Sequence, residues 1–174
     1  IAALSEAQEQ ALVDDEALLL TAVCMLNRWT LSDLCEVYGF KETDALRHFA
    51  HLDRLGLIEL LPGNRVRLRT TRSFNWLPNG PIHRYFSKNH QGPFLRGTFS
   101  GNSEVYQFRF GMMSEESAAE LTRQIGSLLE RFLTLSRRDE VRPRGEGAGT
   151  CLLVAMREWE PDAFAALKTG NLDG

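Results

Sequence analysis

The chain has 174 residues, of which 43% are hydrophobic and 25% charged, and its formal net charge is −3. This is the composition of an ordinary globular protein, with enough length for one large domain or two small ones. Charged residues interrupt every apolar run, and no secretory signal is present at the start. The sequence therefore predicts neither a membrane span nor export.

The charge is distributed unevenly along the chain. Residues 1–27 carry five acids and no base, residues 28–96 eleven bases and six acids, and residues 97–174 nine bases and twelve acids. A phosphate-binding surface is therefore expected in the middle segment, which has a net charge of +5. The three cysteines are scattered and form no C-x-x-C pair. This pattern favours free thiols and a cytoplasmic location.

Residues 4–69 follow the order of elements typical of a winged helix-turn-helix. Helical periodicity covers residues 4–29, and a short second helix is expected from Thr30, an N-cap residue, to Gly39. A third helical pattern covers residues 41–56. The strings LIELL, PGN and RVRLR then predict a strand, a turn and a second strand. Three helices followed by a hairpin is the element order of that class of module.

The outward positions of the third helix and of the hairpin are candidates for DNA contact. An apolar stripe of Ala45, Phe49, Leu52 and Leu55 is expected to be buried, so the opposite helix face meets solvent. In RVRLR the strict alternation turns every arginine outward. Arginine can donate two hydrogen bonds to guanine, and basic side chains bind phosphate. The candidate DNA-binding residues are Arg47, His48, His51, Arg65, Arg67 and Arg69.

Two features count against DNA contact by this module. Glu42 and Asp44 lie where the helix would enter the groove, and carboxylates there repel phosphate although they suit a helix N-terminus. The acidic run 14–16 belongs to the same module. In the alternative interpretation the arginines are the solvent face of an edge strand and the module is a scaffold. This scaffold interpretation is favoured, but DNA contact remains open.

The remaining residues predict a connector and a second module. Residues 74–96 are punctuated by proline and glycine but rich in aromatic residues, which indicates a packed connector containing one short helix. EVYQFRFGMM alternates like a strand, and TCLLVAM is a continuous apolar run typical of a strand covered on both faces. The long helix between them has an apolar stripe expected to be buried: Ala118, Leu121, Ile125, Leu128, Phe132 and Leu135.

The predicted fold class is therefore α+β. A winged helix-turn-helix-like module is expected over residues 1–73, a packed connector over residues 74–96, and an α/β regulatory or dimerisation module over residues 97–174. Strand, long helix and strand form a β-α-β unit, whose strands are usually parallel. A short helix in WEPDAFAAL is expected to end the second module.

Four phrases of this sequence resemble a known family: EAQEQALVDDEALLL, LDRLGLIELLPGNRVRL, FNWLPNGPIHRYF and GTCLLVAMREWEP. Together they look like the C-terminal region of bacterial Cro/CI-type (Xre-family) transcriptional regulators. The resemblance implies that a helix-turn-helix domain of about sixty to seventy residues normally precedes this region and carries the primary DNA contacts. That segment is not in this sequence, so no DNA-contact residue of the family can be transferred to it.

Other chemistry has weaker support in the sequence. No nucleophile elbow, phosphate loop or H-E-x-x-H motif is present, and the histidine pair at positions 48 and 51 has too few partners for a metal. We therefore expect no enzyme, metal site or cofactor. Aromatic residues could line a ligand pocket between the modules, although core packing is the favoured interpretation. The candidates are Trp76, Tyr85, Phe108 and Trp159.

The sequence thus predicts the regulatory and oligomerisation part of a bacterial transcriptional regulator, and auxiliary DNA contact through the winged helix stays open. The expected partners are DNA, through the intact regulator, and a second copy of the chain. A small-molecule or protein effector is also possible. The alternatives are a protein-binding adaptor that never touches DNA and a small-molecule-sensing domain.

Overall fold

A computed structural model describes residues 3–70, 76–139 and 149–169. The chain divides into two units, Ile1–Thr98 and Phe99–Gly174. The predicted boundary between residues 73 and 74 lies outside the described residues. Residues 76–96, predicted to form a connector, belong to the first unit.

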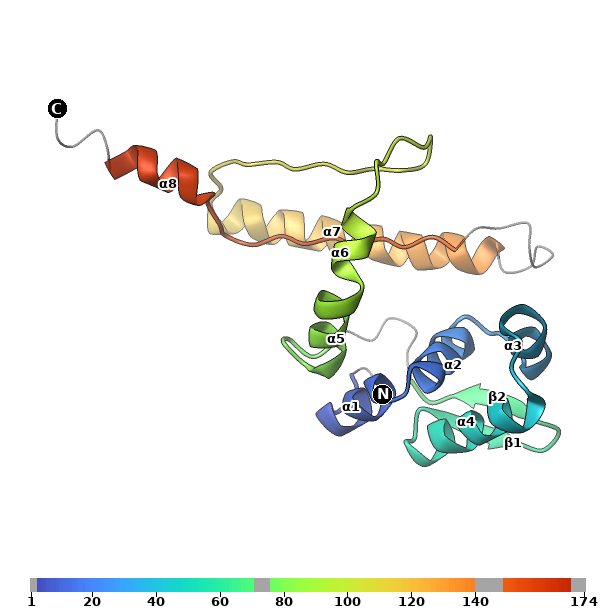
Figure 1. Ribbon diagram of the computed structural model, residues 1–174. Helices are drawn as coiled ribbons and strands as arrows, with labels where there is room; N and C mark the ends of the chain where they lie inside the picture. The colour runs from blue at the N-terminus through green and yellow to red at the C-terminus, as the bar shows by residue number, and fades with distance from the viewer. Residues whose placement is uncertain (1–2, 71–75, 140–148, 170–174) are drawn as a thin grey trace. The chain divides into compact units, whose positions relative to one another are not determined.

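The first unit consists of helices around a small antiparallel hairpin (Figure 1). Helix α2 packs on α4, α3 packs on α4, and α4 packs on the first strand. Two further helices, α5 and α6, follow the hairpin, and α5 packs on α1. The elements are α1 (Glu6–Val13), α2 (Glu16–Leu26), α3 (Leu31–Tyr38), α4 (Glu42–Arg54), β1 (Ile58–Leu61), β2 (Arg65–Leu68), α5 (Pro81–Asn89) and α6 (Gln91–Leu95).

The start of the chain forms two helices where one was expected. Asp15 interrupts the helical pattern because its side chain accepts hydrogen bonds from the backbone N–H groups of Ala17 and Leu18, at 3.0 and 3.1 Å. An aspartate in an extended conformation that does this is an N-cap, so it begins a new helix. Periodicity alone did not reveal this break, because apolar residues continue on both sides of it.

The boundaries of α3 and α4 follow the predicted signals. Thr30 and Asp33 form a reciprocal capping box at the start of α3. Gly39 ends that helix with a φ of 68°, and Gly56 follows α4 with a φ of 73°. Such left-handed conformations favour glycine because it has no Cβ.

The hairpin also has the predicted pattern. Glu59 pairs with Arg67, and Leu60 with Val66. Along β2 the arginines are exposed, whereas Val66 and Leu68 are half-buried and pack against the core. The turn is closed by Gly63 and Asn64, both with positive φ, which these two residue types tolerate best.

All the large buried apolar side chains of the described residues belong to the first unit. They come from α1 to α5, β1 and the residues just before α1 and β1, so one core joins the three-helix group to the hairpin and reaches α5. Of the predicted helical stripe, Leu55 is only half-buried because it follows the last turn of α4. The core consists of Leu4, Leu12, Leu18, Cys24, Met25, Leu34, Ala45, Phe49, Leu52, Leu57, Ile58 and Ile82.

A buried carboxylate fastens α5 to α1. Glu9 is fully buried, and its two oxygens accept hydrogen bonds from the backbone N–H groups of Leu77 at 2.8 Å and Ile82 at 3.1 Å. Helix α5 has no side-chain cap of its own, because Gly80 stands at its N-cap and Pro81 follows. Glu9 therefore satisfies N–H groups that would otherwise be orphaned, next to the positive end of the helix dipole.

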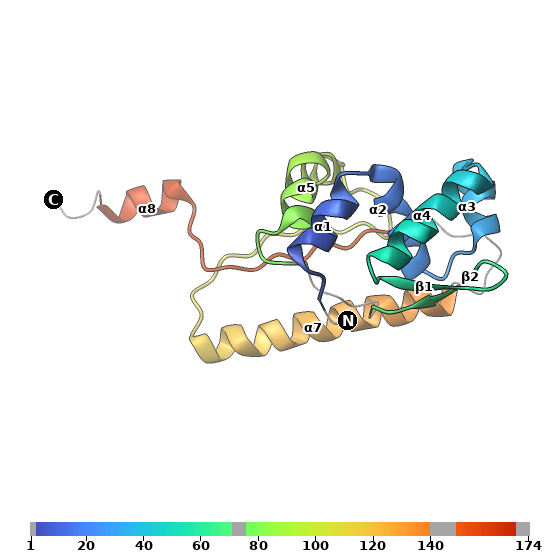
Figure 2. The ribbon, with the colours of Figure 1, turned by 90° about the horizontal axis from the view of Figure 1, so that it is seen from below.

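The second unit contains two helices, α7 (Glu115–Asp139) and α8 (Asp162–Thr169). The Ser114 hydroxyl accepts a hydrogen bond from the Ser117 N–H at 3.2 Å, which agrees with its predicted capping role. Residues 104–113 and 150–157 are extended on either side of α7 in the sequence (Figures 1 and 2). A ring contact with centroids 5.5 Å apart joins Phe110 to Phe164 of α8.

The structure differs here from the predicted β-α-β unit. Within the described part of this unit no segment is hydrogen-bonded as a strand. No residue of α7 is buried, and Leu128 of the predicted stripe is 50% exposed. The physical reason is that strands need hydrogen-bonded neighbours, and a single helix cannot by itself cover two unpaired segments. The chain is thus of mixed α+β class, and the two strands found among the described residues both belong to the first unit.

The Glu9 contact gives the first prediction. Glu9→Gln should lower the free energy of unfolding by about 2 kcal/mol. The NH2 group of the new amide replaces one carboxylate oxygen, and it is a donor that must face a backbone N–H, which is also a donor. Glu6→Gln is the matched control, since Glu6 is exposed on the same helix and should change stability by less than about 0.5 kcal/mol. Urea unfolding followed by circular dichroism measures both. Equal midpoints for the two variants would contradict the assigned role of Glu9.

Candidate nucleic-acid interface

The outward face of α4 carries one exposed arginine of the predicted set. The side chain of Arg47 is 73% exposed, and its guanidinium lies 2.9 Å from the carboxylate of Asp44, one turn earlier. The two residues are three positions apart, which is the spacing of neighbours on a helix surface. Asp44, whose charge disfavours DNA binding, is therefore the ion-pair partner of Arg47, the candidate DNA-binding residue.

His48 does not point freely to solvent. Only 14% of its side chain is exposed, and its ring lies edge-on to that of Phe40, with centroids 5.9 Å apart. Its Nδ1 atom is 3.8 Å from the carboxylate of Asp15 at the start of α2. These contacts brace α4 against α2 and against the turn that precedes it. The prediction that His48 faces outward is wrong. His51, also predicted to face outward, is half-buried.

The hairpin arginines share one acid. Glu59 stands directly opposite Arg67 in the register of the two strands. One of its oxygens accepts hydrogen bonds from the Nε (2.8 Å) and Nη2 atoms of Arg67. The same oxygen lies 3.7 Å from the guanidinium of Arg69. Arg65 donates a hydrogen bond from its Nε atom to the Pro62 carbonyl oxygen at 3.3 Å. This acceptor is neutral, so the bond does not compensate the charge of Arg65.

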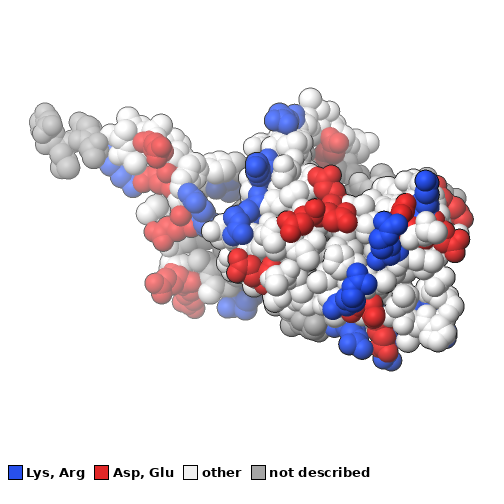
Figure 3. All heavy atoms as spheres, turned by 60° about the horizontal axis from the view of Figure 1, so that its bottom comes forward, with Lys and Arg blue, Asp and Glu red and all other residues white. Residues whose placement is uncertain are grey.

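These pairs reduce the positive charge that the face can offer to DNA. Residues 1–73 contain eight bases and eleven acids, a net charge of −3, so the excess of positive charge in the middle of the chain is local. Figure 3 shows basic and acidic side chains interspersed on the visible face of this unit, without a large patch of one sign. DNA affinity depends on the number of phosphates that cations neutralise. The face is therefore suited to weak contact at most.

The aromatic residues predicted to line a pocket divide between the units. In the first unit, Trp76 contacts Phe86 with ring centroids 5.3 Å apart, and the hydroxyl of Tyr85 donates to Glu16 at 2.6 Å. In the second unit, Phe108 is 62% exposed, and Trp159 is 49% exposed with the Arg157 guanidinium 5.8 Å from its ring. Their joint role in a ligand pocket stays a prediction.

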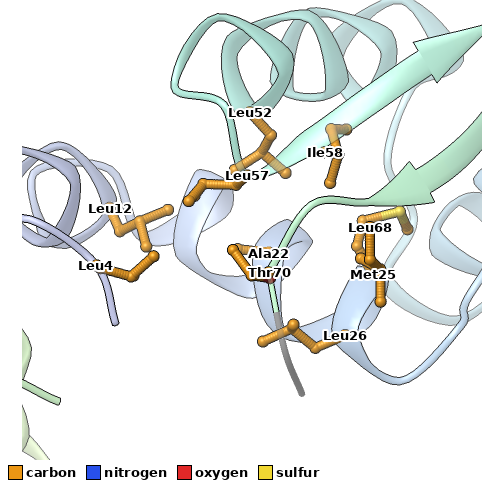
Figure 4. Close-up of a pocket in the computed structure, with 10 residues that line it drawn as sticks. All are labelled: Leu4, Leu12, Ala22, Met25, Leu26, Leu52, Leu57, Ile58, Leu68 and Thr70. Carbon is orange, nitrogen blue, oxygen red and sulfur yellow. The ribbon is translucent and has the colours of Figure 1, made fainter. Parts of the chain in front are cut away.

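A small cavity exists elsewhere, in the core of the first unit (Figure 4). Its volume is about 20 Å³, and it contains none of the four aromatic candidates. An almost wholly apolar space of this size has room for little more than one water molecule, and Thr70 is its one polar lining residue. Its lining is Leu4, Leu12, Ala22, Met25, Leu26, Leu52, Leu57, Ile58, Leu68 and Thr70.

A larger and open groove runs along the turn between α3 and α4. It has a volume of about 450 Å³, and its walls include Lys41, Asp44, Arg47 and His48. It mixes charges of both signs and is not enclosed, unlike typical small-molecule sites, which bury most of their ligand. Two further findings apply to the described residues: no three potential metal ligands converge, and no helix combines the length and apolarity needed to cross a bilayer.

The acids that define this face were only partly recognised from sequence. Asp44 was identified as unfavourable for DNA, but its pairing with Arg47 was not inferred. Glu59 was overlooked, although counting back from the PGN turn places it across from Arg67. That register was the available signal. Glu9 had a signal too, because α5 begins with Gly80 and Pro81 and needs an acceptor from elsewhere.

The contact between Tyr85 and Glu16 predicts a pH effect. The hydrogen bond to the Glu16 carboxylate raises the pKa of the Tyr85 phenol above its ordinary value of 10.0, and burial and the negative charge of Glu16 add to this. The contact therefore stabilises the fold fully below pH 10.0, and its contribution is lost as the pH rises through the folded-state pKa.

Glu16→Gln should move this titration back towards pH 10.0. Ultraviolet absorbance of phenolate follows the titration, and Tyr85→Phe identifies which part of the signal belongs to Tyr85. An unchanged titration in Glu16→Gln would show that the hydrogen bond is not formed in solution.

Comparison with known proteins adds no assignment to this geometry. No family model, no curated protein and no solved structure matches the chain. The functional argument consequently depends on the arrangement of α2 to α4 and the hairpin, on the ion pairs of Asp44 and Glu59, and on the exposed apolar surface of the second unit.

Proposed function

We propose that the chain is the regulatory and oligomerisation part of a bacterial transcriptional regulator. Its first unit is a winged-helix module that makes auxiliary contact with DNA. The observation that carries this proposal is the succession of α2, α3, α4 and the β1–β2 hairpin, with arginines on the exposed side of β2. In winged-helix proteins the second helix of the helix-turn-helix enters the major groove and the hairpin lies against the backbone.

The contact is auxiliary because its cations are largely compensated. Asp44 pairs with Arg47, and Glu59 pairs with Arg67 and lies near Arg69. Phosphate binding by these arginines has to compete with carboxylates that are already in place. Primary sequence recognition then belongs to a separate DNA-binding domain of the regulator, as the resemblance to Xre-family proteins implies.

The second unit sets the distance between the two DNA-binding domains of a dimeric regulator. Two copies held together present two DNA-binding domains at a fixed separation, and half-sites one helical turn apart lie about 34–36 Å from each other. A protein or small-molecule signal that changes this separation changes the affinity for the operator. No catalytic step is part of the proposal.

The competing function is a protein-binding adaptor that never touches DNA. The paired arginines favour it, because a face of interspersed charges also suits a protein partner of complementary pattern. A small-molecule sensor has less support, since the core cavity has a volume of only about 20 Å³ and the larger groove beside α4 is open to solvent.

Removal of the acid shared by the hairpin arginines separates these functions. Glu59→Gln removes the carboxylate that pairs with Arg67 and lies near Arg69, so DNA affinity at low salt should rise several-fold. The slope of log affinity against log salt should steepen by about one to two. Fluorescence anisotropy with a random duplex measures both quantities.

Glu6→Gln changes the net charge equally on α1, away from the hairpin in sequence, and is the matched control. A rise confined to Glu59→Gln supports contact through the hairpin. If neither variant nor the parent chain binds duplex at low salt, auxiliary DNA contact is excluded and the adaptor function gains support.

A further inference from the structure

The second unit exposes an unusual amount of apolar surface. Of the nineteen large hydrophobic residues that are exposed in the described chain, fourteen belong to this unit, and none of the buried core residues does. Isolated exposed apolar residues are normal, but a contiguous set marks an interaction site. The fourteen are Val105, Tyr106, Phe108, Phe110, Met112, Met113, Leu128, Leu129, Leu152, Leu153, Met156, Trp159, Phe164 and Leu167.

The two extended segments of this unit have the course of strands, but neither is hydrogen-bonded as a strand within the described residues. Figure 1 shows residues 104–113 and 150–157 running in the same direction, with α7 returning between them in the sequence, and Figure 2 shows both on the same side of α7. The Nη2 atom of Arg109 donates to the Gln107 side chain at 3.0 Å, so residues two apart share a face. Neither segment pairs with the other as a strand.

We propose that a second copy of this chain fills the place between the two segments. Residues 150–157 of each copy lie beside residues 104–113 and 150–157 of the other. This gives one four-stranded sheet in the order 104–113, then 150–157 of the partner, then 150–157, then 104–113 of the partner. A two-fold axis passes between the central strands, so neighbouring strands are antiparallel and both copies of α7 cover the same face.

The sequence of each segment suits its position in this sheet. Residues 150–157 are almost continuously apolar, as expected for a central strand, whereas residues 104–113 alternate and carry Arg109, as expected at an edge. The second copy is the fitting occupant because each chain lacks the same strands that it offers. A two-fold arrangement satisfies both copies at once.

The exposed apolar side chains of the second unit offer the surface that such an interface needs. One subunit of a large obligate dimer buries about 1,000–2,500 Å². Edges left open to solvent would otherwise invite uncontrolled aggregation.

The inference rests on the oligomerisation part of the proposed function: a monomer would defeat both, whereas a dimer that cross-links elsewhere would overturn the strand pairing alone. Light scattering after size exclusion should give twice the chain mass of 19.7 kDa. A monomer at micromolar concentration would overturn the proposal. A single chain that folds only when a different partner is bound would overturn it as well.

Cysteine scanning then locates the axis. In a Cys151→Ser background, Leu152→Cys, Leu153→Cys, Val154→Cys and Ala155→Cys are oxidised one at a time. Near a two-fold axis a residue faces its own copy, and disulfides need Cα atoms within about 7 Å. Cross-linked dimer should therefore form at one position or two adjacent ones and fall sharply elsewhere.

Lys88→Cys, exposed on α5 of the first unit, is the control and should give no efficient cross-link. A dimer that cross-links through Leu128→Cys on α7 but at none of the four scanned positions would overturn the proposed strand pairing. These substitutions are small and keep the chain length, so a loss of folding does not obscure the result.

Discussion

The first unit depends on a single buried carboxylate. Glu9 has no salt-bridge partner among the described contacts, and it is held by the backbone N–H groups of Leu77, just before α5, and of Ile82, in its first turn. A charge removed from water needs such compensation, and the first turn of a helix supplies both hydrogen bonds and a favourable dipole. The contact joins α1 to a segment about seventy residues later in the chain. It explains why residues 76–96 pack as part of the first unit rather than as a free linker.

Space at this contact is restricted as well. A Cβ atom on Gly80 would lie 2.6 Å from the Glu9 carboxylate and 2.6 Å from the Leu77 side chain. The backbone at Gly80 has an ordinary extended conformation, so glycine is required there for close approach rather than for its φ angle. The sequence Asn79-Gly80-Pro81 thus forms the turn that leads into α5 and also leaves room for the buried Glu9 carboxylate.

Charge pairing limits what the helix and hairpin can do. Of the four arginines predicted to contact DNA, Arg47, Arg67 and Arg69 each have a carboxylate within 4 Å. Exposed pairs of this kind stabilise the fold little, typically below about 1 kcal/mol, so their main effect is on the field of the surface. The proposed division of labour follows: weak contact by the first unit, and assembly by a second unit that cannot bury its own apolar residues.

The sequence by itself determined the local structure of the first unit. Thr30, Gly39 and Gly56 marked helix ends, and the alternation in RVRLR gave the exposed and buried faces of β2, because these signals act within a few residues. It did not reveal Asp15 as a cap within a continuous apolar pattern. It also misplaced His48, because helical spacing cannot show that Phe40 and Asp15 approach the same side of α4.

Only the tertiary structure decided the contacts between distant residues. The burial of Glu9, the shared acid of the hairpin and the absence of strand pairing at residues 104–113 and 151–157 depend on which segments meet in space. The sequence predicted two strands in the second unit, and this prediction was wrong for residues 104–113 and 150–157, because a strand is stable only when neighbouring backbone groups bond to it. Alternation in a sequence records which face a residue takes, and it carries no information on which chain supplies the neighbour.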